Sequence, residues 1–338
     1  MANGKLSHVT REPRLRQNDV KTGASRLCNM AEEFTRQFYH ETSFTVPWGV
    51  IAAKTWGPED GKPFLGLHGW LDNANTFEKL VPLLHKNIRF IAIDFPGHGK
   101  SSHRPPGMGY NNLEYVADVK KVVFQLGWKR FSIIGHSMGG FVAMLFAGCF
   151  PDEVENLILI DCGGPHPRFG NRPAEVLASY ATRMANIKPA NLRVYESVEK
   201  AASRREERVD SFFTLSMEAA LLITRRGTKV TNEGVVFSHD PVVKGLSRPF
   251  YPPEFSIKLI LNRIKSALLI LEGTTSKVEK EIRERSILYC QNAKFHKRKM
   301  VKGGHHFHID NPEQTATEIQ QFLSQCDSQR TDLFSSKL

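Results

Sequence analysis

Apolar residues along this chain follow two periods. Short, mainly apolar runs predict buried strands at 64–67, 90–94, 131–134, 157–160 and 267–271, and a last strand is predicted at 295–301. Between these runs, apolar residues spaced three and four apart predict amphipathic helices, most clearly over 112–126. Continuous apolar strands that alternate with helices are typical of a mostly parallel sheet covered on both faces. With a hairpin at 44–56, we expect an α/β fold with an eight-stranded sheet.

The pattern changes after Asp161 and returns near residue 266. Between them no buried strand run stands out, and helices are predicted at 175–185, 194–202 and 210–224. We interpret 162–265 as a helical cap insertion in an α/β core made of 43–161 and 266–325. The insertion holds 17 Lys and Arg against 10 Asp and Glu, a net of +7 within the chain's +11. Most of this charge is expected on solvated helix surfaces.

Both ends of the chain are polar. Residues 1–42 are basic and lack an apolar core, so they are not a secretory signal; a flexible extension is favoured over a mitochondrial presequence. Residues 326–338 are expected to form a mobile polar tail. It ends in Ser336-Lys337-Leu338, which matches the peroxisomal address read by an import receptor. We therefore expect a peroxisomal protein, with the cytoplasm as the alternative.

Several classes of protein are disfavoured by what the chain lacks. No run of about 18 apolar residues is present, so no membrane span is expected. Zinc-finger spacings, aromatic nucleic-acid motifs and long Lys/Arg runs are also missing, so we expect no nucleic-acid partner. The five cysteines are scattered and odd in number, which favours a reducing compartment over a disulfide framework.

The central motif is Gly-x-Ser-x-Gly at 135–139, between a predicted strand and a predicted helix at 141–150. That order is typical of a nucleophile elbow, a strained turn that presents its serine at a helix N-terminus. Gly135 and Gly139 are expected where strand and helix crowd together. Ser137 is therefore the predicted nucleophile.

A serine hydroxyl needs a neighbouring base, and His305 is the best placed histidine. It lies in the loop after the last predicted strand, at the same sheet edge as the elbow. His306 or His308 would take the role under a different loop conformation. The expected oxyanion-hole donors are the backbone N–H groups of Met138 and Trp70.

Other histidines have simpler interpretations. His68, His98 and His136 lie in Gly-flanked turns, where we expect them to hydrogen-bond backbone groups. The histidine cluster at 305–308 has no carboxylate or cysteine at ligand spacing beside it. We therefore predict neither a metal nor a cofactor.

Several motifs together resemble the α/β-hydrolase superfamily. They are His68-Gly69-Trp70, Asp94-Phe95-Pro96-Gly97-His98-Gly99-Lys100-Ser101, Gly135-His136-Ser137-Met138-Gly139-Gly140, and Gly304-His305 ahead of Asn311-Pro312. The resemblance runs from about 44 to 323, with 162–265 in the place of the cap domain. A finer similarity, at 46–54, 68–74 and 131–133, is to the serine hydrolase-like proteins, which include vertebrate members and the insect protein kraken. It implies a serine hydrolase whose substrate is poorly defined.

The chain departs from the superfamily at the acid of the triad. The superfamily commonly places Asp three residues beyond a Gly after the strand matched by 268–271, and here Ser276 stands there. Glu272 and Glu279 are nearby candidates. Asp161, at the end of the preceding strand, occupies a location that some members use, and we take it as the predicted acid with the other two left open.

These residues predict hydrolysis of a small-molecule carboxylic ester or thioester through an acyl-enzyme. A serine in place of an elbow Asp disfavours a dehalogenase or an epoxide hydrolase. The basic insertion and the Ser-Lys-Leu end favour an acyl-coenzyme A thioester. One alternative is a catalytically weak or inactive ligand-binding protein with this fold, and another is a hydrolase of amides or carbon–carbon bonds.

Overall fold

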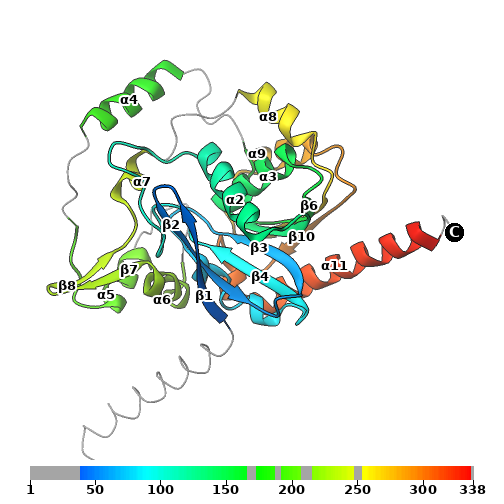
Figure 1. Ribbon diagram of the computed structural model, residues 1–338, viewed down its shortest axis with the longest axis horizontal. Coiled ribbons are helices and arrows are strands. Elements are labelled where there is room, and N and C mark those ends of the chain that lie inside the picture. The colour runs from blue at the N-terminus through cyan, green and yellow to red at the C-terminus, as the bar shows by residue number, and fades with distance from the viewer. Residues whose placement is uncertain (1–38, 166–172, 187–191, 207–214, 247–252, 336–338) are drawn as a thin grey trace, which may run out of the picture. The chain divides into compact units, whose positions relative to one another are not determined.

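Eight strands form one sheet in the order β1-β2-β4-β3-β5-β6-β9-β10 (Figure 1). Their bounds are β1 (Tyr39–Val46), β2 (Gly49–Trp56), β3 (Lys62–Leu67), β4 (Ile88–Ile93), β5 (Phe131–His136), β6 (Val154–Ile160), β9 (Ala267–Gly273) and β10 (Phe295–Val301). β2 runs antiparallel to β4, and every pair from β4-β3 to β9-β10 is parallel. The predicted mostly parallel eight-stranded sheet is confirmed.

This computed structural model describes residues 39–165, 173–186, 192–206, 215–246 and 253–335. The described elements after Tyr39 belong to one compact unit, His40–Leu338. The predicted extension up to residue 38 and the terminal Ser336-Lys337-Leu338 lie outside the described residues. Among the described helices, none is both long enough and apolar enough to cross a membrane.

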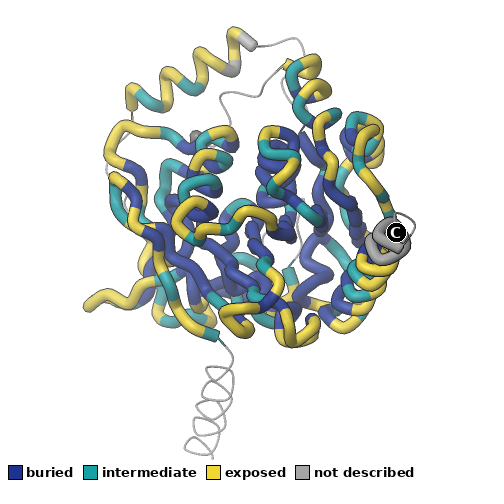
Figure 2. The backbone as a smooth tube through the Cα atoms, turned by 45° about the vertical axis from the view of Figure 1, so that its right-hand side comes forward, coloured by how far each residue is buried: buried dark blue, intermediate teal, exposed yellow. Residues whose placement is uncertain are grey.

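The helices that cover the sheet form two groups, and the helices within each group contact one another. The first group is α2 (Asn112–Leu126), α3 (Met138–Cys149), α8 (Glu254–Leu261) and α9 (Lys280–Tyr289). The second is α10 (Phe307–Asp310) and α11 (Pro312–Ser335) with the 3-10 turns η1 (Ala74–Phe77) and η2 (Val81–Leu83). Every residue of β5 and β9 is buried, so both faces of the sheet are covered. In Figure 2 the buried stretches, in dark blue, gather in the interior.

The chain between β6 and β9 forms the insertion. It contains α4 (Pro173–Ala185), α5 (Val198–Glu206), α6 (Met217–Arg226), α7 (Pro241–Leu246) and α8, together with a hairpin of β7 (Thr228–Thr231) and β8 (Gly234–Phe237). The expectation of helices without strands is therefore incomplete. The hairpin escaped the sequence pattern because β7 is mostly exposed and has no apolar run.

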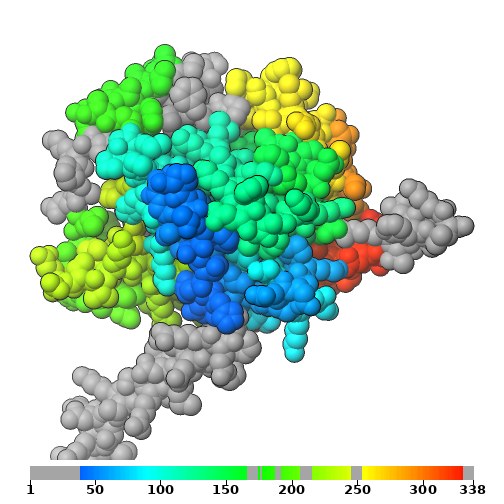
Figure 3. Space-filling model, viewed as in Figure 1, coloured from blue at the N-terminus to red at the C-terminus, as the bar shows by residue number. Residues whose placement is uncertain are grey.

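The insertion is joined to the sheet by Arg226, the last residue of α6. Its Nε donates to both carboxylate oxygens of Asp94, at 3.0 and 2.9 Å, and its Nη1 donates to Glu41 at 2.7 Å. Asp94 follows β4, and Glu41 lies in β1. In Figure 3 the β1–β2 edge, in blue, lies beside the yellow-green part of the insertion that includes this contact.

Two element ends differ from the sequence prediction. β1 begins at Tyr39, inside the segment that we assigned to the extension. The closing helix α11, expected to end near residue 323, continues to Ser335 through most of the predicted mobile tail. A polar helix that extends past the packed core has no apolar periodicity to reveal its length.

Candidate active site

Ser137 sits at a sharp turn between β5 and α3. Its φ of 51° and ψ of −115° are strained for a residue with a side chain, at a cost of about 1–3 kcal/mol. The turn is too tight for larger residues, because a Cβ on Gly139 would lie 2.0 Å from the carbonyl oxygen of Leu67. At Gly135 a Cβ would lie 2.6 Å from the Cα of Gly140. The strand–turn–helix order and the crowding predicted for this motif are both present.

Backbone strain is concentrated around this turn. Among the described residues, three that are not glycine have positive φ: Leu71 at 61°, Ser137 at 51° and Asp161 at 44°. They lie on the loops after β3, β5 and β6, which are neighbours in the sheet. Strain of this kind persists only where surrounding contacts enforce it, and it gathers at functional sites. The loops that meet at this edge of the sheet are therefore the candidate active site.

His305, in the loop after β10, contacts Asp161 directly. Its Nδ1 lies 2.6 Å from Oδ2 of Asp161, and both side chains are buried. A carboxylate can only accept a hydrogen bond, so Nδ1 carries the proton and Nε2 carries the lone pair of the neutral ring. This is the tautomer that a general base for a serine requires.

Asp161 accepts three further hydrogen bonds. Ser276 Oγ donates to Oδ2 at 2.6 Å, while Arg283 Nη2 and the Gly273 N–H donate to Oδ1 at 3.0 and 3.1 Å. Burial raises the pKa of Asp161, but the hydrogen bond from His305 and the charge of Arg283 outweigh it and hold the pKa below its ordinary value. Asp161 is thus ionised at neutral pH and held in a fixed orientation.

The other two candidate acids are placed differently. Glu272 is engaged by Arg298, which donates to its two oxygens at 2.7 and 2.9 Å, and by Arg283 Nη1 at 3.1 Å. Glu279 is exposed and directly precedes α9 as its N-cap residue. Of the three carboxylates that the sequence left open, Asp161 is the one hydrogen-bonded to His305.

The surroundings of His305 keep its ring uncharged. Burial lowers its pKa to about 3, although the hydrogen bond to Asp161 favours the charged form. The ring is therefore neutral at pH 7. His305 contacts His136, the residue before Ser137. His136 Nε2 donates to the carbonyl oxygen of His305 at 3.0 Å, and the two ring centroids are 4.7 Å apart.

The neighbouring histidines have other partners. His308 Nε2 lies 2.8 Å from Thr76 Oγ1, and His306 Nε2 donates to Asp72 at 3.2 Å. As expected for histidines in Gly-flanked turns, His68 and His98 contact backbone groups: His68 Nδ1 donates to the Gly69 carbonyl at 2.7 Å, and His98 Nδ1 lies 3.1 Å from the Pro96 carbonyl. Of the histidines at 305–308, His305 is the one that lies within hydrogen-bonding distance of the Asp161 carboxylate.

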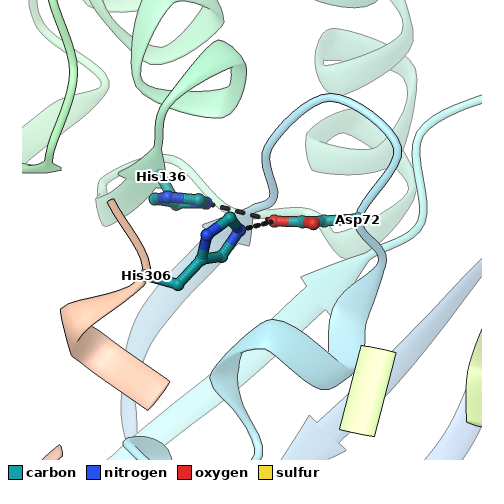
Figure 4. Close-up of side chains that lie close together, drawn as sticks. All are labelled: Asp72, His136 and His306. Atoms are coloured by element: carbon teal, nitrogen blue, oxygen red, sulfur yellow. Dashed lines mark hydrogen bonds and ion pairs between the residues drawn. The ribbon is translucent and has the colours of Figure 1, made fainter. Parts of the chain in front are cut away.

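A second buried cluster lies next to the first. Asp72, from the loop after β3, points its carboxylate at the rings of His136 and His306 (Figure 4). The sequence argument against a metal considered only ligand spacing along the chain, and the fold adds a carboxylate from a distant segment. Asp72 is 234 residues away from His306 along the chain, so only the fold brings them together.

The two expected oxyanion donors lie on the loops where they were predicted. Met138 is the first residue of α3, directly after Ser137. Trp70 is half-buried in the loop after β3, and its side-chain Nε1 donates to the Val243 carbonyl at 3.3 Å. That contact involves the side chain of Trp70 and not its backbone N–H. The role of the Met138 and Trp70 N–H groups as oxyanion-hole donors stays a prediction.

Comparisons with known proteins agree on the family. Residues 62–230 match the family model described as alpha/beta hydrolase fold. A "Serine hydrolase-like protein" of Danio rerio is 35% identical over 312 residues, which cover 85% of this chain and 89% of that protein. A hypothetical protein of Pseudomonas aeruginosa PAO1 superposes with a TM-score of 0.75 at 32% identity, over 85% of this chain and 99% of that one. A thioesterase domain from the curacin biosynthetic pathway gives 0.72 at 25% identity, over 83% and 99%.

Proposed function

Because this chain belongs to the α/β-hydrolase fold family, among its serine hydrolase-like proteins, we propose that it cleaves carboxylic esters or thioesters through an acyl-enzyme on Ser137. The observation that carries the proposal is the 2.6 Å hydrogen bond between Asp161 and His305, beside a strained serine turn. That bond supports Asp161, which the sequence predicted with Glu272 and Glu279 left open, as the acid of the triad.

The proposed reaction begins with attack of Ser137 Oγ on the carbonyl carbon of the substrate. His305 Nε2 accepts the proton of the hydroxyl, and the ionised Asp161 stabilises the imidazolium that forms. The N–H groups of Met138 and Trp70 would hold the oxyanion. His305 then returns the proton to the leaving alcohol or thiol, which departs as the C–O or C–S bond breaks.

The second half of the reaction uses the same groups. Water attacks the acyl carbon, and His305 takes one of its protons. The tetrahedral intermediate collapses, Ser137 recovers its proton from His305, and a carboxylic acid leaves. The pKa of His305, about 3, keeps the ring neutral at the start of each half-reaction, and the ionised Asp161 offsets part of the cost of protonating so weak a base.

Labelling by a fluorophosphonate probe tests the nucleophile. We expect the wild type to be labelled, and Ser137→Ala to be unlabelled. Ser132→Ala is the matched control, because Ser132 is a buried serine on β5, the strand that leads to Ser137, and its Oγ accepts from Asn156 at 2.9 Å. Equal labelling of wild type and Ser137→Ala would refute the assignment.

The ester or thioester choice is tested by turnover of p-nitrophenyl esters and of acyl-coenzyme A thioesters by the same preparation. The thioester is supported by the net +7 of the insertion and by the likeness to a thioesterase domain. Part of that charge serves structure instead, since Arg226 pairs with Asp94 and Arg205 donates to the Leu71 carbonyl. Absence of turnover with both classes, in a protein that binds acyl ligands, would favour the ligand-binding alternative.

We also propose a peroxisomal location, through recognition of Ser336-Lys337-Leu338 by an import receptor. The test is a fluorescent fusion with this C-terminal end exposed. Puncta that coincide with a peroxisomal marker are expected for the full chain, and a diffuse cytoplasmic signal after deletion of Leu338. Unchanged puncta in the deletion variant would contradict the proposal.

A further inference from the structure

Three side chains that can bind a metal ion converge beneath the candidate active site. Asp72 Oδ2 and His306 Nε2 come from the loops after β3 and β10, His136 Nδ1 comes from the last residue of β5, and all three atoms lie within 4.8 Å of one another (Figure 4). Each of the three residues is buried, with an exposed fraction of 5% or less. The group is therefore distinct from the exposed acidic clusters that occur on most protein surfaces.

The ring of His136 is held in one tautomer. The carbonyl oxygen of His305 can only accept, so His136 Nε2 carries a proton and donates to it at 3.0 Å. In the neutral ring Nδ1 then has a lone pair, and that lone pair faces Asp72 Oδ2 at 3.2 Å. Nδ1 is buried and has no hydrogen-bond partner. A lone pair that faces a buried carboxylate is unfavourable unless a positive charge lies between them.

The same arrangement is the usual setting of a metal-binding histidine. Such a histidine donates its other ring N–H to a carboxylate or a backbone carbonyl, which fixes the ring orientation and makes the ligand nitrogen more basic. His136 already has this hydrogen bond, to the carbonyl of His305. Its Nδ1 is thus oriented toward Asp72 before any ion arrives.

The spacing of the ligand atoms fits a small ion. Asp72 Oδ2 lies 3.2 Å from His136 Nδ1 and 3.2 Å from His306 Nε2. Tetrahedral zinc with bonds of about 2.0–2.1 Å places its ligand atoms about 3.3 Å apart. Two imidazoles and one carboxylate also suit zinc, cobalt, nickel or copper, whereas calcium and magnesium require a shell of oxygen atoms.

We propose that Asp72, His136 and His306 form a binding site for one divalent transition-metal ion. On binding, His306 gives its Nε2 to the metal, and its proton moves to Nδ1. The ligands stand next to or near Ser137, His305 and Trp70 in sequence. An ion would therefore join the three loops that carry the proposed nucleophile, base and oxyanion donor, and so brace them against one another.

The site is tested with Co²⁺, whose visible absorption depends on its ligands, in a Ser137→Ala background. The proposed nucleophile is absent from this background, so the result does not depend on the hydrolase proposal. We expect one Co²⁺ per chain, with a visible spectrum that Zn²⁺ abolishes by competition. At about a hundredfold excess over the dissociation constant, Zn²⁺ should raise Tm by about 5 °C.

Variants locate the ion. Asp72→Asn and His306→Gln should each lose the Co²⁺ spectrum and the Tm shift. His308→Gln is the matched control: His308 is a buried histidine two residues from His306, but its Nε2 contacts Thr76 Oγ1 at 2.8 Å, and the variant should bind Co²⁺ as the parent does. Far-UV circular dichroism of each variant verifies folding.

Two results would overturn the proposal. One is failure of the parent protein to bind Co²⁺, which would mean that a proton on His136 Nδ1 supplies the positive charge beside Asp72. The other is an unchanged spectrum in Asp72→Asn and His306→Gln, which would place the bound ion at other histidines. Because the first result needs no substitution of a proposed metal ligand, the proposal is testable even if such a substitution prevents folding.

Discussion

Ser276 donates a hydrogen bond from Oγ to Oδ2 of Asp161, at 2.6 Å. The same oxygen accepts the hydrogen bond from His305 Nδ1. Ser276 occupies the sequence position where the superfamily commonly has its acid, so the carboxylate of Asp161 reaches the place that a residue 276 carboxylate would occupy. The two loops, after β6 and after β9, meet because those strands are neighbours in the sheet.

Replacing the acid tests this arrangement. Asp161→Asn should lower kcat with a p-nitrophenyl ester by about 10²- to 10⁴-fold, because an amide neither stabilises the imidazolium nor fixes the tautomer of His305. The measurement is steady-state turnover, with Ser137→Ala as the background level. Turnover within twofold of the wild type would mean that another group orients His305.

A carboxylate on the loop after β9 should be able to replace Asp161 as the hydrogen-bond partner of His305. Adding Ser276→Asp to Asp161→Asn is expected to raise kcat about tenfold or more above the single variant, since Ser276 Oγ already lies beside the oxygen that His305 meets. Ser276→Ala in the same background is the matched control and should give no recovery. A double variant no faster than Asp161→Asn would contradict the shared location.

The contact between insertion and sheet should matter for stability. Arg226→Gln leaves the fully buried Asp94 carboxylate without its charged partner, so we expect the free energy of unfolding to fall by about 3–5 kcal/mol. Arg225→Gln, at the exposed neighbouring position, should change it by less than about 0.5 kcal/mol. Denaturant unfolding followed by tryptophan fluorescence measures both, and equal effects would count against the role of the Arg226–Asp94 pair.

Glu41 provides a prediction about pH. Burial raises its pKa, but hydrogen bonds and charge from Arg226 and then Lys100 outweigh burial and hold the pKa below its ordinary value. A lowered pKa means that the ionised Glu41 stabilises the fold at pH above its unfolded value of about 4.3, and that this contribution is lost as pH falls through the folded value. The carboxylate is 42% exposed, so solvent screening limits the contribution to about 0.5 kcal/mol.

Glu41→Gln should therefore be less stable than the wild type at pH 7, and the difference should shrink below about pH 4. Glu59→Gln, at an exposed glutamate in the turn before β3, is the control and should show no such trend. The measurement is the urea midpoint between pH 3 and pH 8. A difference that grew toward low pH would reverse the expected sign.

The thiols should differ in reactivity. Burial raises the pKa of Cys162 and of Cys290 to about 12, so neither forms a thiolate at pH 8, and both side chains are enclosed. Cys149 is exposed, although partial burial of its thiol raises its pKa. Alkylation of the native protein with peptide mapping should modify Cys149 first of these three. Faster modification of Cys162 would contradict the packing around Asp161.

Local patterns predicted most of the core, because its signals lie within single segments. Most of the parallel strands are short apolar runs, with the charged β10 as an exception, and the elbow is a five-residue motif with a strand before it and a helix after it. Position along the sheet edge then placed Ser137 and His305 on loops that meet. These inferences needed only periodicity and the rule that parallel strands end at one edge.

What the sequence could not determine depends on contacts between distant segments. Asp161, Glu272 and Glu279 are all carboxylates near strand ends, and only the folded arrangement separates the partner of His305 from the partner of Arg298. Asp72 joins His136 and His306 through packing of three loops, for which no local spacing exists. The exposed β7 and the polar end of α11 lack apolar periodicity, so their structure leaves no pattern in the sequence.

The placement of the acid on the loop after β6 affects how the protein can diverge. Ser137 and Asp161 both precede the insertion, and their separation is set by the pairing of adjacent strands, with Gly135 opposite Leu159 and His136 opposite Ile160. Changes in the length or sequence of the insertion leave that register untouched. The insertion can thus change in evolution while the spacing between the proposed nucleophile and the proposed acid is inherited unchanged.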